Sequence, residues 1–368
     1  MVTGFFWDET TFWHSAGNYA DILPVGGLVQ PMVAGGLPET PDSKRRLKNL
    51  LEVTGLATEL HMSGAAAATS AELLRVHPDS YLDTFKTLSD AGGGELGHRT
   101  PFGPGGYEIA AQSAGLVVQA LRSVLNADLQ NAYALTRPPG HHALPDHPNG
   151  FCMLANIAIA IETARAEGSA TRFAVIDWDV HHGNGTEAIF YDRDDVLTVS
   201  IHQDRNYPMD QGAAEDRGTG AGHGFNLNVP LPPGSGHNTY IEAMERLAIP
   251  AVRAFAPDVV IIACGFDAAA MDPLGRMMCH QATYREMTTQ VMNLAADVCD
   301  GRLVMAHEGG YSEVYVPFCG HEVLATMSRS SITAPDPFGE TWFLRQPNAE
   351  FDAFASGQLT RMAQAANL

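Results

Sequence analysis

The sequence predicts an α/β fold, in which helices flank a central and mainly parallel β-sheet. Several short apolar runs do not alternate with polar residues, as expected for parallel strands that helices cover on both faces. Segments with helical spacing separate these runs, and this order of strand and helix indicates a parallel sheet. The expected strands are 132–136, 172–176, 196–201, 258–263 and 302–306, and the expected helices are 42–55, 108–125, 154–166, 240–255 and 283–299.

The helical segments rest on apolar spacing. In the first of them, Leu47, Leu50 and Leu51 form an apolar stripe beside charged residues, and in the second the apolar period stops at Asn126. Because the strands after residue 130 are expected to share one sheet, we predict a single domain over residues 1–368. The Pro- and Gly-rich stretches between the patterned segments are expected to be loops, at 24–41, 92–106, 137–150, 208–224 and 230–236.

Composition excludes several classes of protein. The chain has 368 residues and a formal net charge of −20, which opposes binding to nucleic acid and weakly favours cationic partners. No apolar run approaches the roughly 20 residues that cross a membrane, so we expect no membrane contact. The N-terminus lacks a basic leader, which predicts a cytoplasmic protein. Five dispersed cysteines argue against a disulfide framework and predict inert, buried thiols.

Polar side chains follow the expected strand 172–176. Asp177, Asp179 and His181 occupy alternate positions, so in extended backbone their side chains point to the same side. Zinc accepts both imidazole nitrogen and carboxylate oxygen, which makes Asp179 and His181 candidate ligands. The alternative is that the aspartates cap the next helix and His181 packs at the surface. Unpaired polar groups at the end of a buried strand are costly, so we favour the metal site.

Asp267 follows the expected strand 258–263. A single aspartate at this place is more often a helix N-cap. A catalytic zinc, however, takes three protein ligands and keeps its fourth position for water. Asp267 would complete that set with Asp179 and His181.

Adjacent histidines follow the expected strand 132–136 and a rigid Pro-Pro-Gly turn. An imidazole titrates near neutral pH, so His141 and His142 are candidates for a general acid and base beside the metal. A second interpretation makes both of them further zinc ligands. The residues alone leave these two interpretations open.

Two glycines and a tyrosine follow the expected strand 302–306. Gly309 and Gly310 allow the backbone to approach a ligand closely. The hydroxyl of Tyr311 would then be placed to donate a hydrogen bond to an oxyanion. The alternative is a buried aromatic residue with a satisfied hydroxyl.

Five polar or glycine-rich blocks follow one another along the chain. They are Arg137-Pro138-Pro139-Gly140-His141-His142, Gly150-Phe151-Cys152, Asp177-x-Asp179-x-His181-His182-Gly183-Asn184-Gly185, Asp267 before Asp272-Pro273-Leu274-Gly275, and Glu308-Gly309-Gly310-Tyr311. In this order the blocks resemble the histone deacetylase family, over about Pro38 to Cys319. The last block and Asn184 resemble class II members, and the run Thr100–Glu108 is similar to bacterial histone-deacetylase-like amidohydrolases of that class.

The resemblance implies the arginase/deacetylase fold, with about eight strands, and one catalytic zinc per chain. By similarity, Asp179, His181 and Asp267 bind that zinc, whereas the two histidines do not. The resemblance also implies that His141 pairs with Asp177 and that His142 is the general base and acid. Tyr311 resembles the residue that polarises the acyl carbonyl.

The resemblance also implies a narrow substrate channel and structural potassium. Phe151 is similar to one channel wall, and Tyr207 takes the place of the phenylalanine that usually forms the other. The expected channel residues are Gly150, Phe151, Tyr207, Leu274 and Gly310. The expected potassium ligands are Asp177, Asp179, His181, Ser200 and Ile201 at one site, and Phe190, Arg193, Val196 and Phe225 at a second.

The function that this resemblance implies is hydrolysis of an acetyl-lysine peptide or protein, or of a small acetylated amine, to acetate and a free amine. The nearest alternative is an acetylpolyamine amidohydrolase. Less favoured are an arginase-like ureohydrolase, which needs two manganese ions, and a non-hydrolytic reader of acyl-lysine. By analogy with bacterial relatives we expect a homo-oligomer, with segment 24–41 as a candidate interface.

Overall fold

One sheet of eight strands runs through the computed structural model, which describes residues 2–30 and 36–368. The strand order is β10-β9-β8-β11-β12-β7-β1-β4, and every neighbouring pair is parallel. The mainly parallel sheet predicted from the apolar runs is therefore confirmed. The strands are β1 (Thr3–Phe6), β4 (His61–Ser63), β7 (Asn131–Ala134), β8 (Phe173–Asp177), β9 (Val196–Gln203), β10 (Asn226–Leu231), β11 (Val259–Cys264) and β12 (Leu303–His307).

The five expected strands are all present, with ends shifted by a residue or two, and three others were not predicted. β1 and β4 are too short to show a pattern. β10 lies at a sheet edge and carries Asn226 and Asn228, which interrupt its apolar run. Both amides donate to Glu187 Oε2 at 2.7 Å, so these polar side chains are buried with a partner. Two short antiparallel pairs stand apart, β2 (Tyr19–Ala20) with β3 (Leu23–Pro24) and β5 (Gly94–Glu95) with β6 (Pro101–Phe102).

The expected helices are also present. The first ends at Gly55, whose φ of 89° is the left-handed conformation that glycine adopts freely. The expected helix 240–255 consists of α7 and α8, joined by a π-helical turn at Met244–Ala248. The helices are α1 (Asp42–Thr54), α2 (Ser70–Leu73), α3 (Asp79–Asp90), α4 (Gly106–Leu125), α5 (Asn156–Ala166), α6 (Asn184–Phe190), α7 (His237–Ala243), α8 (Ile249–Phe255), α9 (Gln281–Cys299), α10 (Val316–Ser328), α11 (Gly339–Leu344) and α12 (Ala349–Ala366).

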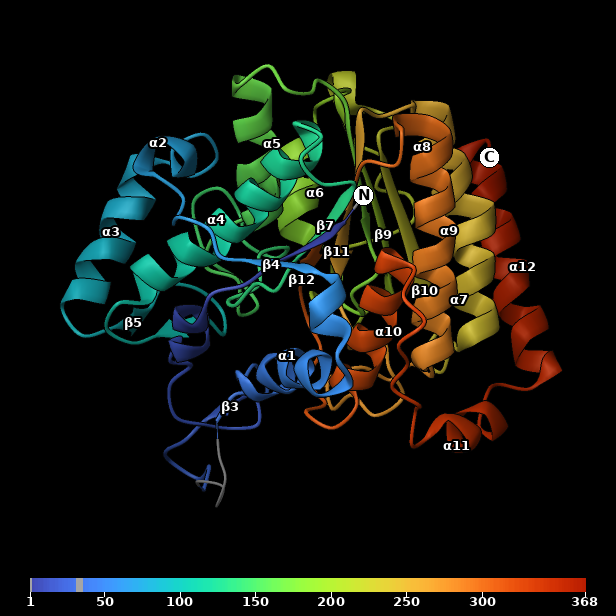
Figure 1. Ribbon diagram of the computed structural model, residues 1–368, viewed down its shortest axis with the longest axis horizontal. Helices are drawn as coiled ribbons and strands as arrows, with labels where there is room; N and C mark the ends of the chain where they lie inside the picture. The colour runs from blue at the N-terminus through green and yellow to red at the C-terminus, as the bar shows by residue number, and fades with distance from the viewer. Residues whose placement is uncertain (1, 31–35) are drawn as a thin grey trace.

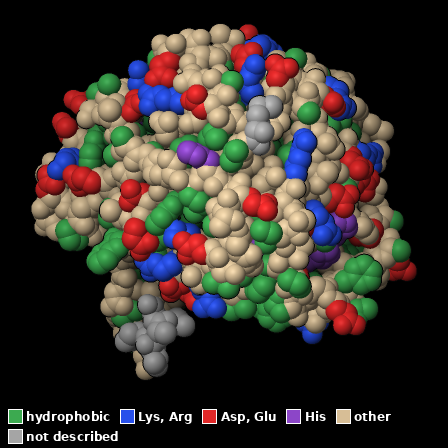
Figure 2. Space-filling model, in the orientation of Figure 1, with side chains coloured by type: hydrophobic (Ala, Val, Ile, Leu, Met, Phe, Trp, Pro, Cys, Tyr) green, Lys and Arg blue, Asp and Glu red, His purple; other side chains and the backbone are tan. Residues whose placement is uncertain are grey.

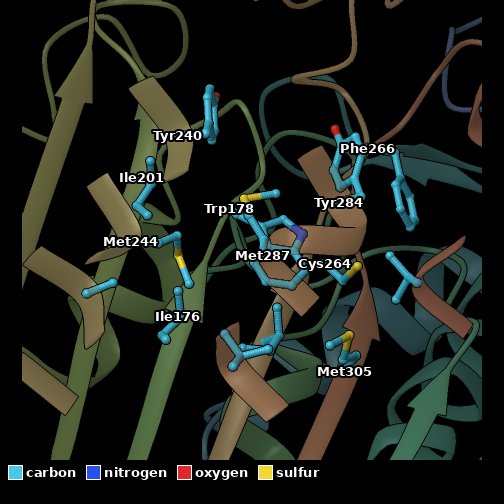
Figure 3. Packing of buried hydrophobic residues seen from close by; sticks show 14 of the residues in the cluster. Ile176, Trp178, Ile201, Tyr240, Met244, Cys264, Phe266, Tyr284, Met287 and Met305 are labelled. Carbon is cyan, nitrogen blue, oxygen red and sulfur yellow. The ribbon is translucent and has the colours of Figure 1, made fainter. Parts of the chain in front are cut away.

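Helices cover both faces of the sheet, with α2 to α5 on one side and α7 to α9 and α12 on the other (Figure 1). Strand β8 contributes to both cores, since Ala174 and Ile176 pack on one side and Phe173 and Val175 on the other. This two-sided burial explains why the run does not alternate with polar residues. Figure 3 shows the core on the side of α7 and α9, where Trp178 packs among methionine, isoleucine and tyrosine side chains.

The cysteines are found as composition predicts: all five are buried and unpaired, in line with their dispersed spacing. On the face shown in Figure 2, acidic and basic side chains are interspersed over the surface. Within residues 2–30 and 36–368, no helix has both the length and the apolar content needed to cross a bilayer.

A buried ionic network fixes the N-terminal part of the chain to the turn after β7. The Glu39 carboxylate lies 3.1 Å from both Lys44 Nζ and Arg137 Nε, and all three side chains are at most 2% exposed. Arg137 also donates to the carbonyl oxygens of Thr11 and His14. Burial alone would raise the pKa of Glu39, but the cations Arg137 and Lys44 outweigh it and lower that pKa.

We expect Glu39→Ala to lower the free energy of unfolding by about 3–5 kcal/mol, because it leaves two buried cations without their counter-ion. Glu9→Ala is the matched control, since its half-exposed pair with Arg45 should contribute less than about 1 kcal/mol. Urea unfolding at pH 7 measures both. A carboxyl with a lowered pKa stabilises the fold above its ordinary pKa, so the difference should shrink as the pH falls below about 4. Equal losses in the two variants would contradict this assignment.

Candidate active site

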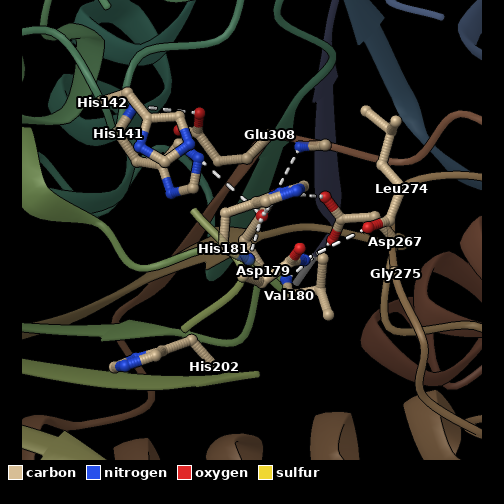
Figure 4. A network of polar contacts seen from close by, with 12 residues as sticks. His141, His142, Asp179, Val180, His181, His202, Asp267, Leu274, Gly275 and Glu308 are labelled. Atoms are coloured by element: carbon tan, nitrogen blue, oxygen red, sulfur yellow. Dashed lines mark hydrogen bonds and ion pairs between the residues drawn. The ribbon is translucent and has the colours of Figure 1, made fainter. Parts of the chain in front are cut away.

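Two carboxylates and one imidazole meet at the carboxyl ends of neighbouring strands β8 and β11. His181 Nδ1 lies 3.0 Å from Asp179 Oδ1 and 3.0 Å from Asp267 Oδ2. The three candidate ligand atoms lie within 4.8 Å of one another, and all three side chains are buried (Figure 4). The structure therefore brings together the three residues predicted to bind zinc. The carboxyl edge of a parallel sheet is where ligands bind in such folds.

Backbone N–H groups hold the two carboxylates in place. Asp179 Oδ2 accepts from Gly309 N at 2.7 Å, and Asp267 Oδ1 accepts from Val180 N at 2.8 Å. A Cβ atom at Gly309 would lie 2.1 Å from Asp267 Oδ2, so only glycine allows this approach. The loops after β8 and β12 thus orient the ligand set before any cation binds.

The electrostatics of this cluster favour a cation at its centre. Burial and the neighbouring Asp179 raise the pKa of Asp267 to about 8. Burial would lower the pKa of His181, but its hydrogen bonds to the two carboxylates outweigh that effect and raise it to about 10. A proton on His181 is thus one way to balance the acidic pair, and a divalent cation bound to its deprotonated nitrogen is another. One imidazole and two carboxylates are a donor set that zinc accepts, so the residues fit this metal.

The two adjacent histidines do not belong to this ligand set. His141 Nδ1 lies 2.9 Å from Asp177 Oδ2, and His142 Nδ1 lies 2.7 Å from Asn184 Oδ1. With Asn184 Oδ1 as acceptor, His142 Nδ1 carries a proton and Nε2 is free to accept one. Their ring centroids are 3.9 Å apart. Of the two interpretations that the residues left open, this geometry favours the acid–base pair.

The surroundings push the pKa values of the two imidazoles apart. Burial would lower the pKa of His141, but the carboxylates of Asp179 and Asp177 raise it to about 10. Burial and the adjacent His141 hold the pKa of His142 well below its ordinary value. One ring is therefore charged and the other neutral near pH 7. Paired groups with opposed pKa shifts are typical of acid–base sites.

Glu308 supports the histidine turn, a role that the sequence did not reveal. Its Oε2 accepts from Gly140 N at 2.7 Å and from His141 N at 3.1 Å, and the side chain is fully buried. Burial raises the pKa of this carboxyl to about 7. The sequence did carry one signal for this role. Glu308 stands between a strand expected to be buried and two glycines, and a carboxyl group at such a position is expected to be buried with a partner.

Tyr311 faces the cavity from the loop after β12. Its backbone N–H donates to Asp272 Oδ2 at 2.7 Å, and its ring centroid lies 5.7 Å from that of Phe151 and 6.3 Å from that of His181. Burial raises the pKa of the Tyr311 hydroxyl, so this group is a donor at neutral pH. Asp272 also accepts from the backbone of Leu274, and its anchoring role was not predicted.

A cavity of about 240 Å³ opens above these groups. Tyr207 forms part of its wall, with its ring centroid 5.1 Å from that of His142, and its hydroxyl donates to Asn149 Oδ1. The tyrosine therefore keeps an aromatic wall and satisfies its polar atom outside the cavity. Gly310, expected in the channel, is not among the residues that line this cavity, and a Cβ atom at Gly310 would lie 2.9 Å from Phe266 Cβ. The cavity is lined by Asp21, Ile22, Arg99, His142, Gly150, Phe151, His181, Asn206, Tyr207, Pro273, Leu274, Arg276 and Tyr311.

The expected potassium ligands fall in two places. Asp177 pairs with Ser200 across β8 and β9, and both line a small polar cavity beside the active site. In the second set, the Phe190 carbonyl accepts from Arg193 N at 3.1 Å and the Phe225 carbonyl accepts from Thr198 N at 3.0 Å. Both potassium sites stay predictions. Figure 4 shows His202 apart from His141, His142 and His181. Its ring nitrogens lie 2.9 Å from Ser200 Oγ and 3.0 Å from the Gly212 carbonyl oxygen.

Comparison with known proteins shows the family to which the chain belongs. The family model described as the histone deacetylase domain matches residues 37–327. The chain is 54% identical to the histone deacetylase-like amidohydrolase of Pseudomonas aeruginosa, over 98% of this chain and 95% of that protein. It is 36% identical to histone deacetylase 8 of Arabidopsis thaliana, over 87% of this chain and 85% of that protein.

A solved structure is similar to this chain in fold. The crystal structure of the HDA15 HD domain superposes with a TM-score of 0.81 and 31% identity, covering 100% of this chain and 99% of that one. This similarity and the sheet order identify the arginase/deacetylase fold. With a family model matched over most of its length, the chain belongs to the histone deacetylase family and is a hydrolase of amide bonds.

Proposed function

We propose that the chain is a zinc-dependent deacylase that hydrolyses the amide of Nε-acetyl-lysine, or of a similar N-acyl amine, to acetate and free amine. The observation that carries this proposal is the cluster of Asp179, His181 and Asp267. Its His181 lines the same cavity as His142 and Tyr311. Metal-ligand, base and donor groups thus converge on one cavity of about 240 Å³.

In this mechanism Asp179, His181 and Asp267 would hold the zinc ion. When bound, zinc supplies Lewis acidity, which polarises the acyl carbonyl and makes water more acidic. Tyr311 donates its hydroxyl hydrogen to the carbonyl oxygen and stabilises the negative charge that develops there. Its backbone bond to Asp272 fixes the main chain of Tyr311 at the cavity wall.

His142 handles the proton. Its Nδ1 donates to Asn184, so Nε2 takes the proton from the attacking water and then gives it to the nitrogen of the leaving amine. His141, paired with Asp177, carries a positive charge beside it, which favours the neutral form of His142 before the reaction. Water and amide are consumed, and a carboxylate and a protonated amine are formed.

The alternatives differ in metal and substrate. An arginase-like ureohydrolase needs ligands for a second metal ion. The other described group of three potential ligands is His141, Cys152 and Glu308, where His141 is paired with Asp177 and Glu308 accepts two backbone N–H groups. One zinc and no manganese per chain by elemental analysis supports the deacylase. Turnover of a fluorogenic acetyl-lysine excludes a non-hydrolytic reader.

We further propose one catalytic domain over residues 1–368, bound potassium, a cytoplasmic location and self-association. Residues 31–35 of the candidate interface 24–41 lie outside the described residues. Light scattering of the purified protein gives its oligomeric state, and elemental analysis after dialysis against sodium gives its potassium content.

We expect Asp267→Ala to lose zinc and activity together, because two ligands hold the metal far less tightly than three. Elemental analysis and an acetyl-lysine assay on the same preparation measure both. Asp297→Ala, which removes a surface carboxylate, is the control and should keep full zinc. Full zinc occupancy in Asp267→Ala would show that the third ligand is wrongly assigned.

We expect Tyr311→Phe to lower kcat about a hundredfold or more while zinc stays bound, since only the oxyanion donor is removed. The phenylalanine keeps the ring contact with Phe151 and the backbone bond to Asp272. Tyr107→Phe is the matched control outside the cavity and should leave kcat near the wild-type value. Near-normal turnover of Tyr311→Phe would remove this hydroxyl from the mechanism.

A further inference from the structure

The mouth of the active-site cavity carries two guanidinium groups. Arg99 and Arg276 line it, and Asp21 is the one acidic side chain among the described lining residues above the metal cluster. The chain as a whole has a net charge of −20. The local balance at the mouth is therefore opposite in sign to that of the protein.

Arg99 is built into the channel walls. Its carbonyl oxygen accepts from Phe151 N at 3.1 Å, and its guanidinium lies 5.5 Å from the centre of the Tyr207 ring. Its φ of 58° is uncommon for a residue with a side chain, so the surrounding contacts hold this conformation. The nearby Glu95 carboxylate accepts from Tyr19 OH and Thr100 N and, within the described chain, forms no ion pair with Arg99.

Arg276 is held by main-chain contacts in the loop after Leu274. Its Nη1 donates to the carbonyl oxygens of Pro273 and Gly275 at 2.8 and 2.7 Å, and its backbone N–H donates to Gln203 Oε1. These bonds fold the guanidinium over the loop and leave its other N–H groups without a carboxylate partner in residues 2–30 and 36–368. Two positive groups from separate loops are thus fixed at one opening.

The position of these groups bears on the part of a substrate that stays outside the channel. When the acyl group of acyl-lysine reaches the metal cluster, its four methylenes occupy the channel and its α-carbon lies at the mouth. In an acylated polyamine the same region of the substrate carries protonated amines. Arginine binds carboxylates through paired charge-assisted hydrogen bonds and repels ammonium groups.

On the basis of the proposed deacylase function, we propose that Arg99 and Arg276 select acyl-lysine substrates with a carboxylate beside the acylated arm, and disfavour acylated polyamines. The carboxylate is either the α-carboxylate of the acyl-lysine itself or the side chain of a neighbouring acidic residue. Among the residues that line the cavity, two guanidinium groups face the single carboxylate of Asp21. The Glu95 carboxylate lies outside this lining and accepts from Tyr19 OH and Thr100 N.

The test uses substrates that differ by a single charge. Nα,Nε-diacetyl-lysine and its methylamide share the acylated arm, so the ratio of their kcat/KM values isolates the α-carboxylate. Peptides with Asp or Asn after acetyl-lysine isolate the side-chain source, and N-acetylputrescine represents the polyamines. We expect the wild type to favour each carboxylate substrate over its neutral partner by about threefold to tenfold, as for partly exposed charge pairs, and N-acetylputrescine to be the poorest substrate.

The variants Arg99→Gln and Arg276→Gln, alone and together, should reduce these ratios toward one, whereas Arg253→Gln, at a surface ion pair, should leave them unchanged. In the wild type, added salt should also reduce the ratios, a measurement that does not depend on the folding of any variant. Equal kcat/KM values for charged and neutral partners in the wild type, or ratios that persist in the double variant, would overturn the inference while leaving the deacylase intact. Zinc-loaded protein that hydrolyses none of the substrates would overturn the proposed function instead.

Discussion

The site depends on the burial of five carboxyl groups at one edge of the sheet. All are less than a tenth exposed, and an unpaired buried carboxylate is costly. Each of the five groups has a hydrogen-bond partner, so they lie close together at this edge and none of them is buried unpaired. The carboxyl groups and their donors are Asp177 with His141, Asp179 with Gly309 N, Asp267 with Val180 N, Asp272 with Tyr311 N, and Glu308 with Gly140 N and His141 N.

This requirement explains the backbone around the site. Gly309 lies where a Cβ would meet Asp267, and a Cβ at Gly183 would lie 2.2 Å from Asp177 Oδ2. At Gly309 the absence of a side chain lets the backbone N–H reach Asp179, while the imidazoles of His141 and His181 contact the carboxylates from their own loops. Parallel strands make this possible, because β8, β11, β12 and β7 are neighbours and all end at the same edge. The sheet sets the positions of the ligands, and the glycines allow the loops to close over them.

Prediction from the sequence worked where the signal was local. Asp179 and His181 meet as predicted, although β8 ends at Asp177 and residues 179–181 form a bend; Asp179 Oδ1 accepts from the His181 backbone N–H at 2.9 Å and lies 3.0 Å from its Nδ1. Prediction was incomplete for residues whose hydrogen-bond partners are distant in the sequence. Glu308 bonds to a turn 168 residues earlier, and no spacing reveals such a contact. The sequence also left open whether the two histidines bind metal or transfer protons, because their contacts with Asp177 and Asn184 are seen only in the folded chain. Edge strand β10 was not predicted because its asparagines, which bond to a helix residue, interrupt the apolar run.

The cavity described above is assembled from unrelated pieces of chain. Its base comes from strand ends, whereas its rim comes from the segment at Asp21 and from the loops that carry Arg99, Tyr207 and Arg276. Surface loops accept sequence change far more readily than buried strand ends. After gene duplication, a copy of such an enzyme can therefore acquire a new substrate through a few rim substitutions while the inherited reaction is retained. Paralogues of this fold are expected to diverge first at the entrance and last at the base.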